Sequence, residues 1–273
     1  VFMGLNPNVV PMVSQRMALP VLKAGVSTTW VGESQQTNAN QPSFGMRYLD
    51  MHKTVTIVPL SHEWAMMASP QADALVRRNM VRSMALAHDL KFIRGDGTAN
   101  TPKGLKALCP AANSNNITAP ASAPYTAREV KKEIRNNLIE KIEGADVDID
   151  SLGFIMTSRT KNALASLTDS NNNPVFETEI ARGQLMGHNF GVSNQIPKNL
   201  DASTAGTNDE TEIYAAAFDE VYVGQMQGGT VIQAYDGATY RDSGGTLVSG
   251  LSNDEIVLTD RGFAGMQVGH EEA

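Results

Sequence analysis

The residue types that could do chemistry are scattered along this 273-residue sequence. No two of the five histidines lie four residues apart, so the H-E-x-x-H zinc motif is absent; the five are His52, His62, His88, His188 and His270. The single cysteine, Cys109, excludes an internal disulfide and a cysteine-based zinc site, and we expect it to be buried. The sequence therefore predicts no metal site. A site assembled from histidines distant in the sequence is the alternative left open.

Two glycine motifs resemble catalytic loops but lack the residues that catalysis needs. Gly95-Asp96-Gly97-Thr98 lacks the full Walker pattern and follows a predicted helix rather than a strand, which favours a turn with positive φ at glycine. Gly25-Val26-Ser27 lacks the closing glycine of a nucleophile elbow. Glutamates and lysines alternate over residues 129–143, which is typical of a solvated helix face. We therefore predict no catalytic residue, no cofactor-binding site and no enzymatic activity.

The charge balance argues against a dedicated nucleic-acid binder. The chain has 22 Lys and Arg against 29 Asp and Glu, a formal net charge of −7. The densest basic patch is Arg77, Arg78, Arg82 and Arg94. A nucleic-acid contact is one interpretation of this patch, and we favour pairing with acidic neighbours or plain solvation. No apolar run approaches about 18 residues, so we expect no membrane-spanning segment.

One long helix dominates the predicted elements. Apolar residues recur every three or four positions over residues 71–94, which indicates an amphipathic helix; they are Ala72, Leu75, Val76, Met80, Met84, Ala87 and Leu90. Ser69 is the expected N-cap, Pro70 the first helical residue, and Gly95 the end.

The segments before this helix predict an arm and a hairpin. Pro7, Pro11 and Pro20 favour an irregular, extended arm over residues 1–30. Residues 28–59 predict two strands with a polar tip, in which Val55 and Ile57 form one apolar face. Because an isolated two-stranded hairpin is marginal in water, this one needs a partner surface.

The remaining chain mixes helices and strands without a βαβ repeat, which favours an α+β fold. Thr126 to Glu129 has the capping-box form and predicts a helix that Gly144 ends. Residues 153–157 predict a buried strand, followed by a helix capped by Ser158. Polar connectors are expected at residues 113–124 and 201–211, and strands at residues 185–196, 212–218, 221–223, 230–234 and 255–268.

Several short motifs, taken in order, resemble tailed-phage major capsid proteins of the Hong Kong 97 type. The most specific covers residues 87–105 and includes the Gly95-Asp96-Gly97-Thr98 turn and Pro102-Lys103-Gly104-Leu105. The others are Trp30-Val31-Gly32-Glu33, Thr56-Ile57 with Leu60-Ser61 and Glu63, Ile155-Met156 with Ser158, Leu185-Met186-Gly187 with Val192-Ser193, Phe218-Asp219 with Tyr222-Val223, and Asp254-Glu255-Ile256.

The resemblance implies an α+β Hong Kong 97-like subunit with four parts. These are an N-terminal arm (1–29), an extended β-hairpin loop (30–59), a peripheral domain (60–110 and 228–260) with a spine helix (71–94), and an axial domain (111–227 and 261–273). It also implies self-assembly into pentamers and hexamers of an icosahedral shell around double-stranded DNA, which the subunit contacts non-specifically. The protein would then be part of the virion capsid, assembled in the bacterial cytoplasm, with the portal and any decoration proteins as partners.

Family knowledge adds three finer expectations. Trp30, Phe44, Tyr48 and the arginine patch of the long helix are expected to contact neighbouring subunits. Some family members cross-link a loop lysine to an asparagine; here the only loop lysine, Lys53, is near the base, so we expect no cross-link. The sequence begins at Val1, so we also expect an upstream scaffolding segment that maturation removes.

Two other functions stay open. An encapsulin-type bacterial compartment would keep the fold and enclose an enzyme instead of DNA. A soluble α+β hydrolase or binding protein would instead be a small oligomer with a polar pocket, and the missing nucleophile and metal motifs argue against it.

Overall fold

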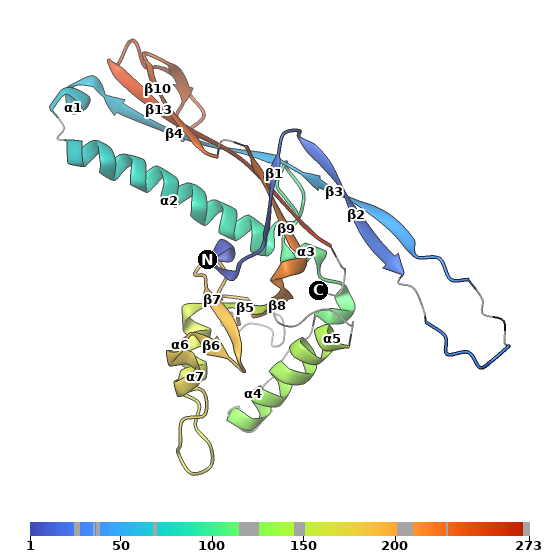
Figure 1. Ribbon diagram of the computed structural model, residues 1–273. Helices are drawn as coiled ribbons and strands as arrows, with labels where there is room; N and C mark the ends of the chain where they lie inside the picture. The colour runs from blue at the N-terminus through green and yellow to red at the C-terminus, as the bar shows by residue number, and fades with distance from the viewer. Residues whose placement is uncertain are drawn as a thin grey trace.

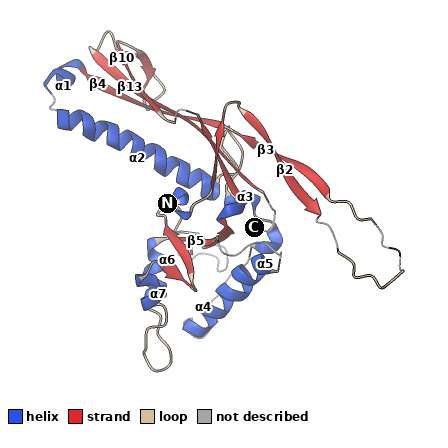
Figure 2. Ribbon diagram, in the orientation of Figure 1, coloured by secondary structure: helices blue, strands red, loops and turns tan. Residues whose placement is uncertain are grey.

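The computed structural model describes residues 1–24, 28–34, 36, 39–67, 70–114, 126–144, 151–200, 210–227 and 229–269. These residues form an α+β fold, as predicted (Figures 1 and 2). It has a long helix-and-sheet part, here called the arm and distinct from the predicted N-terminal arm, a smaller body of helices and strands, and a projecting hairpin. No helix among them is long and apolar enough to span a membrane.

The largest sheet is built around β13 (Glu255–Val268), whose bounds are those predicted. β10 (Val231–Asp236) and then β9 (Val221–Met226) pair antiparallel along one edge of β13. β4 (His52–Ser61) pairs antiparallel along the other edge, and β1 (Asn8–Met12) extends the sheet by parallel pairing with β9. One continuous strand therefore joins the far end of the arm to the body (Figure 1).

Helix α2 (Pro70–Arg94) confirms the predicted long helix and lies along one face of this sheet (Figure 1). Met80, Met84 and Phe92 are buried in that contact, whereas Leu75 is 66% exposed. The predicted apolar stripe is therefore wrong at Leu75 and at Ala87, because the described residues leave both side chains exposed. The expected N-cap, Ser69, lies outside the described residues.

The hairpin differs from the prediction. Its strands are β2 (Arg16–Ala24) and β3 (Ser43–Asp50), which pair antiparallel from Arg16↔Asp50 to Ala24↔Ser43. Residues 28–31 form no strand, and β4 belongs to the large sheet rather than to the hairpin. Residues 1–24 are likewise not irregular, since Pro11 and Pro20 lie within strands at sheet edges, where no ladder N–H is needed.

The body contains a four-stranded sheet in the order β6-β7-β5-β8, with β5 at an inner position. The strands are β5 (Leu152–Met156), β6 (Gln184–Leu185), β7 (His188–Val192) and β8 (Tyr214–Ala217). Every residue of β5 is buried, which confirms the predicted buried strand. Around it lie α4 (Ala127–Ile134), a π-helical turn (Arg135–Ile139), α5 (Glu140–Glu143), α6 (Ser158–Ala165) and α7 (Glu177–Ala181).

Local capping explains where the body helices begin. Thr126 and Glu129 form the predicted capping box at the start of α4, and Gly144 is the C-cap of α5. The N-cap of α6 is Thr157 rather than the predicted Ser158, because the Thr157 hydroxyl accepts the Thr160 N–H at 3.1 Å. The first N–H groups of a helix have no partner within the helix, and the Thr157 hydroxyl lies where it can accept one of them.

Short elements complete the chain. They are η1 (Phe2–Leu5), α1 (His62–Met67), α3 (Leu105–Leu108), η2 (Ala111–Asn113), η4 (Phe218–Glu220), β11 (Thr239–Arg241) and β12 (Leu247–Ser249). The β11–β12 hairpin was not predicted, since its strands are only three residues long. The connector at 113–124 and the loop at 201–211 fall largely outside the described residues.

Phe2 packs between the long helix-and-sheet arm and the body. Its buried ring lies 5.5 Å from the ring of Phe92 on α2 and 5.5 Å from that of Phe218 in the body. The expected boundary between residues 260 and 261 falls inside β13. The division into peripheral and axial domains therefore stays a prediction.

Candidate functional site

The Gly95-Asp96-Gly97-Thr98 motif forms a structural turn, as predicted. Gly97 has φ +77°, and Asp96 accepts hydrogen bonds from the N–H and hydroxyl of Thr98 at 3.1 and 2.6 Å. These bonds favour the ionised carboxylate and lower the pKa of Asp96 to about 2. The Asp96 carboxylate is therefore used within the turn, and the motif has a structural role at the C-terminal end of α2.

The four histidines in the described part of the chain do not form a cluster. Among the described residues, no group of three or more His, Cys, Asp or Glu side chains could hold a metal ion. His88 instead pairs with Thr54, with 3.0 Å between Nε2 and Oγ1. His270 lies outside the described residues. Cys109 is exposed rather than buried, because it lies just past the end of the short helix α3.

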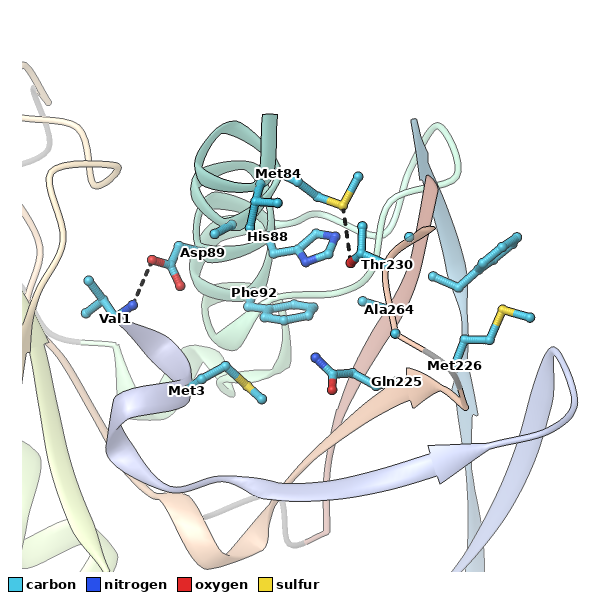
Figure 3. Close-up of a pocket in the computed structure, with 15 residues that line it drawn as sticks. Val1, Met3, Met84, His88, Asp89, Phe92, Gln225, Met226, Thr230 and Ala264 are labelled. Carbon is cyan, nitrogen blue, oxygen red and sulfur yellow. Dashed lines mark hydrogen bonds and ion pairs between the residues drawn. The ribbon is translucent and has the colours of Figure 1, made fainter. Parts of the chain in front are cut away.

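A cavity of about 300 Å³ lies between η1, α2 and the sheet (Figure 3). Its lining is mainly apolar and includes Met3, Met84, Phe92 and Ala264. Asp89, its charged side chain, accepts the Val1 ammonium at 3.0 Å and the Phe2 N–H at 3.1 Å. Asp89 thus anchors the first residues, and the cavity presents no nucleophile paired with a base.

The hairpin turns a row of large apolar side chains to solvent. Phe44, Met46 and Tyr48 alternate along β3, so they share one face, and their exposed fractions are 70%, 72% and 49%. On the same face, the Arg16 guanidinium lies 5.0 Å from the Tyr48 ring centroid and pairs with Asp50 at 2.5 Å. Hydrogen bonding to Arg16 lowers the pKa of Asp50. We call Phe44, Met46 and Tyr48 the hairpin face.

The large sheet has a second uncovered apolar surface, on the side away from α2. Thr54 contacts His88 of α2, so the alternating residues Val55 and Ile57 point the opposite way and are exposed. Val231 and Tyr235 of β10 lie on the same side by register, and the Arg261 guanidinium lies 5.7 Å from the Tyr235 ring centroid. We call Val55, Ile57, Val231 and Tyr235 the open sheet face.

Two apolar residues of β4, Val55 and Ile57, thus point outward, while Val58 and Leu60 lie on the opposite, half-buried side of the strand. The alternation of Val55 and Ile57 was visible in the sequence. The side of the sheet that these two residues face was not visible, because the position of α2 relative to β4 depends on tertiary packing. The open sheet face was therefore missed as a candidate surface.

The other expected contact residues are exposed but separate. Trp30 is 97% exposed in the loop beyond the hairpin strands. Arg77, Arg78 and Arg82 lie on the uncovered side of α2, where Arg77 pairs with Asp73 at 2.8 Å. Arg94 instead turns to Glu212 of the body at 3.1 Å. The structure therefore does not bring the four arginines into one patch.

Comparison with known proteins places the chain among capsid proteins. Residues 7–251 match the model described as "Phage capsid family". The chain is 28% identical over 256 residues to the "Major capsid protein" of Klebsiella oxytoca phage phiKO2, which covers 93% of this chain but only 58% of that relative. The chain therefore spans less than two thirds of the length of this curated relative.

Solved structures show the same fold. A Mycobacterium phage Adephagia structure superposes with a TM-score of 0.73 at 17% identity, covering 98% of this chain and 83% of the other. The "Capsid of native GTA particle computed with C5 symmetry" has a TM-score of 0.71 at 14% identity, covering 99% and 87%. These identities are low, so these matches establish the fold alone.

Proposed function

Because the chain belongs to the phage capsid family, we propose that it is a major capsid protein whose copies assemble into the icosahedral head shell of a tailed bacteriophage. Membership of this structural family agrees with the prediction that the chain is not an enzyme. One observation carries the proposal within the molecule. Two large apolar faces, on the hairpin and on the sheet, have no partner within the described protomer.

The hairpin is the element that needs a neighbour most. It projects away from the arm and the body (Figure 1), and an isolated two-stranded ribbon is marginally stable in water. In this proposal the hairpin face packs on the open sheet face of a second copy, and both apolar surfaces leave water. Such a contact joins two different patches, so it is heterologous, and rings or shells result when the rotation closes.

The family also suggests a ring geometry for the assembly. We propose pentamers and hexamers as the repeating units, and the five-fold symmetry applied to a structurally similar capsid supports the first of these. The long arm with α2, β4, β10 and β13 would be the peripheral domain, and the body with the four-stranded sheet the axial domain. Trp30 and the exposed arginines of α2 would lie at further contacts between copies.

The proposed shell encloses double-stranded DNA within the virion and assembles in the bacterial cytoplasm. A net charge of −7 suits non-specific and weak contact with that DNA, because a strongly basic inner wall would hold it. The portal and, where present, decoration proteins would be the other partners. No observation favours the encapsulin alternative, and the contents of the particles would reveal it.

Assembly of a hairpin variant tests this proposal. Phe44→Ser, Met46→Ser and Tyr48→Ser, combined, remove the apolar hairpin face, so we expect closed particles to be lost while the protomer stays folded. The control is Val13→Ser with Leu251→Ser, two residues that are 89% and 79% exposed outside both faces.

Sedimentation velocity reports the particle fraction, and circular dichroism reports folding. Particles from the control but not from the hairpin variant would support the proposal. Particles of normal size and yield from the folded hairpin variant would contradict it.

A further inference from the structure

Two glycines lie side by side where the hairpin meets the large sheet. Gly265 of β13 pairs directly with Gly224 of β9. Residues that pair directly across two strands point to the same face of a sheet, so this face carries no side chain at either position. We call Gly224 and Gly265 the glycine pair.

The base of the hairpin fills the space that the glycine pair leaves. A Cβ built on Gly265 would lie only 2.0 Å from the Asp50 carbonyl oxygen. A Cβ built on Gly224 would lie 2.4 Å from Met12 Sδ and 3.0 Å from Leu49 Cδ2, and both of those side chains are buried. The hairpin base therefore lies closer to the sheet than a side chain at position 265 would allow.

Two hydrogen bonds hold β3 in the same place. The Gln267 side-chain amide donates to the Tyr48 carbonyl at 3.2 Å, and the Arg47 guanidinium donates to the Val268 carbonyl at 2.9 Å. Hydrogen bonds depend on angle as well as on distance, whereas apolar contacts have no preferred direction. The two bonds therefore restrain the orientation of the strand as well as its position.

The chain leaves the large sheet at this point. The pairing of β4 with β13 ends at His52↔Ala264, and the backbone at Asp50 crosses over Gly265, the next residue of β13. From there β3 and its partner β2 project as the hairpin (Figure 1). The direction of the hairpin is thus set where its backbone crosses Gly265.

The glycine pair and the open sheet face lie on the same side of the sheet. Gly265 is four positions along β13 from Arg261, whose guanidinium lies over Tyr235 of the open sheet face. Residues at even spacing along a strand point to the same side. The protomer's own hairpin therefore covers one end of this side and leaves the other end for a second copy.

We propose that the glycine pair is a positioning element of the shell, because the direction it gives the hairpin sets the rotation between neighbouring copies. The contact proposed above joins two different patches, and their relative orientation on one protomer determines the rotation from each copy to the next. Rings close only at particular rotations, and other rotations produce open filaments. This inference rests on the proposed function and deepens it by naming residues that control closure.

Gly265→Ala changes the direction of the hairpin and leaves both apolar faces in place. Non-bonded atoms need a separation of about 3.5 Å, so the Asp50 carbonyl has to move by about 1.5 Å. We expect closed particles to be lost and open, elongated assemblies to appear in electron micrographs, because the faces still bind but the rotation no longer closes. Circular dichroism verifies that the protomers are folded.

The matched control for assembly is Gly4→Ala. The Cβ added there meets nothing within 4 Å, so this variant should form the same particles as the wild-type chain.

A distance measured within dilute protomers tests the first step without any assembly. Spin labels are attached through Ala18→Cys at the hairpin base and Ser83→Cys on α2, two exposed positions, after the exposed native cysteine is removed by Cys109→Ser. The chain that keeps both glycines should give one narrow distance distribution. Gly265→Ala should shift the mean of that distribution by about 1.5 Å.

Gly224→Ala provides a milder second variant. Its added Cβ meets the flexible ends of the Met12 and Leu49 side chains rather than backbone, so its protomer should fold even if that of Gly265→Ala does not. We expect a smaller shift of the same distance and fewer closed particles.

A broad distance distribution in the chain that keeps both glycines would overturn the proposal, and so would an unchanged mean in folded Gly265→Ala protomers. Closed particles of normal size and yield from a variant with a shifted hairpin would overturn it as well, because the hairpin direction would then not control closure. Failure of the wild-type chain to assemble would instead contradict the proposed function, and the distance measurement would still test the positioning role.

Discussion

Gly95 and Gly104 allow the chain to pass very close to the C-terminal end of α2. The Gly104 N–H donates to the Gly95 carbonyl at 2.8 Å, where the strand-like segment after the turn crosses the last turn of the helix. A Cβ built on Gly104 would lie 2.6 Å from the Gly95 nitrogen and 2.7 Å from the Lys91 carbonyl oxygen. Both of those are backbone atoms, so the helix end itself would have to move.

Gly104→Ala should therefore destabilise the protein by about 1–3 kcal/mol, the usual range for overpacking. The free energy of unfolding in urea measures this effect. Gly4→Ala is the matched control, because a Cβ there meets nothing within 4 Å, and its effect should stay within about 0.5 kcal/mol. Equal stability of the two variants would show that the Gly95–Gly104 crossing tolerates a side chain.

At this scale the sequence predicts local chemistry well and distant contacts poorly. The capping box of Thr126 and Glu129 and the positive φ of Gly97 depend on residues within a few positions, and both predictions are confirmed. The hydrogen bond between Asp89 and Phe2 joins residues that are 87 positions apart in the sequence. The burial of Asp260 depends on the packing of different layers against each other. No local pattern encodes such contacts.

Among the elements, the hairpin depends most on its surroundings. Leu19 and Leu49 near its base pack with Met12, whereas Phe44 and Met46 farther out are exposed. An element with few buried contacts opens locally at low cost in free energy. The hairpin should therefore be ordered at its base in the free protomer and become fully ordered only against a neighbour.

Hydrogen exchange before and after assembly tests this expectation. Amides of residues 43–48 in β3 should exchange quickly in unassembled protomers and at least about tenfold more slowly in particles. The fully buried strand β5 is the control and should be protected in both states. Slow exchange of residues 43–48 in the free protomer would mean that the hairpin needs no partner.

Element types are read from the sequence more reliably than their partners. The periodicity over residues 71–94 predicts α2 within one residue, and the bounds of β13 are those expected. The hairpin was misplaced because β3 and β4 follow one another with only Met51 between them and read as one strand. Their separation reflects pairing with β2 and β13, which are distant in the sequence.

For the whole molecule, the position of its lysines bears on how a shell would be held together. Lys53, the lysine expected near the hairpin, lies in β4 at the position paired with Phe263 of the large sheet. It is therefore placed in the sheet, whereas the hairpin strand β2 includes a different lysine, Lys23, which lies before the predicted loop of residues 30–59. We expect non-covalent contacts between copies and no isopeptide cross-links.

A denaturing gel of purified particles checks this point. We expect no covalent bond between the copies, so the chain should migrate as a single band of 29.3 kDa. A ladder of multiples of that mass would contradict the expectation. Protomers that have never assembled, run beside the particles, provide the reference band.

The central claim is that the unpartnered faces of this chain exist to meet other copies of it. Electron microscopy of the full chain expressed alone, and together with the rest of its gene product where one exists, tests that claim most directly. We predict closed icosahedral shells or five- and six-membered rings. A uniformly small, monomeric species over a range of protein and salt concentrations would contradict the account.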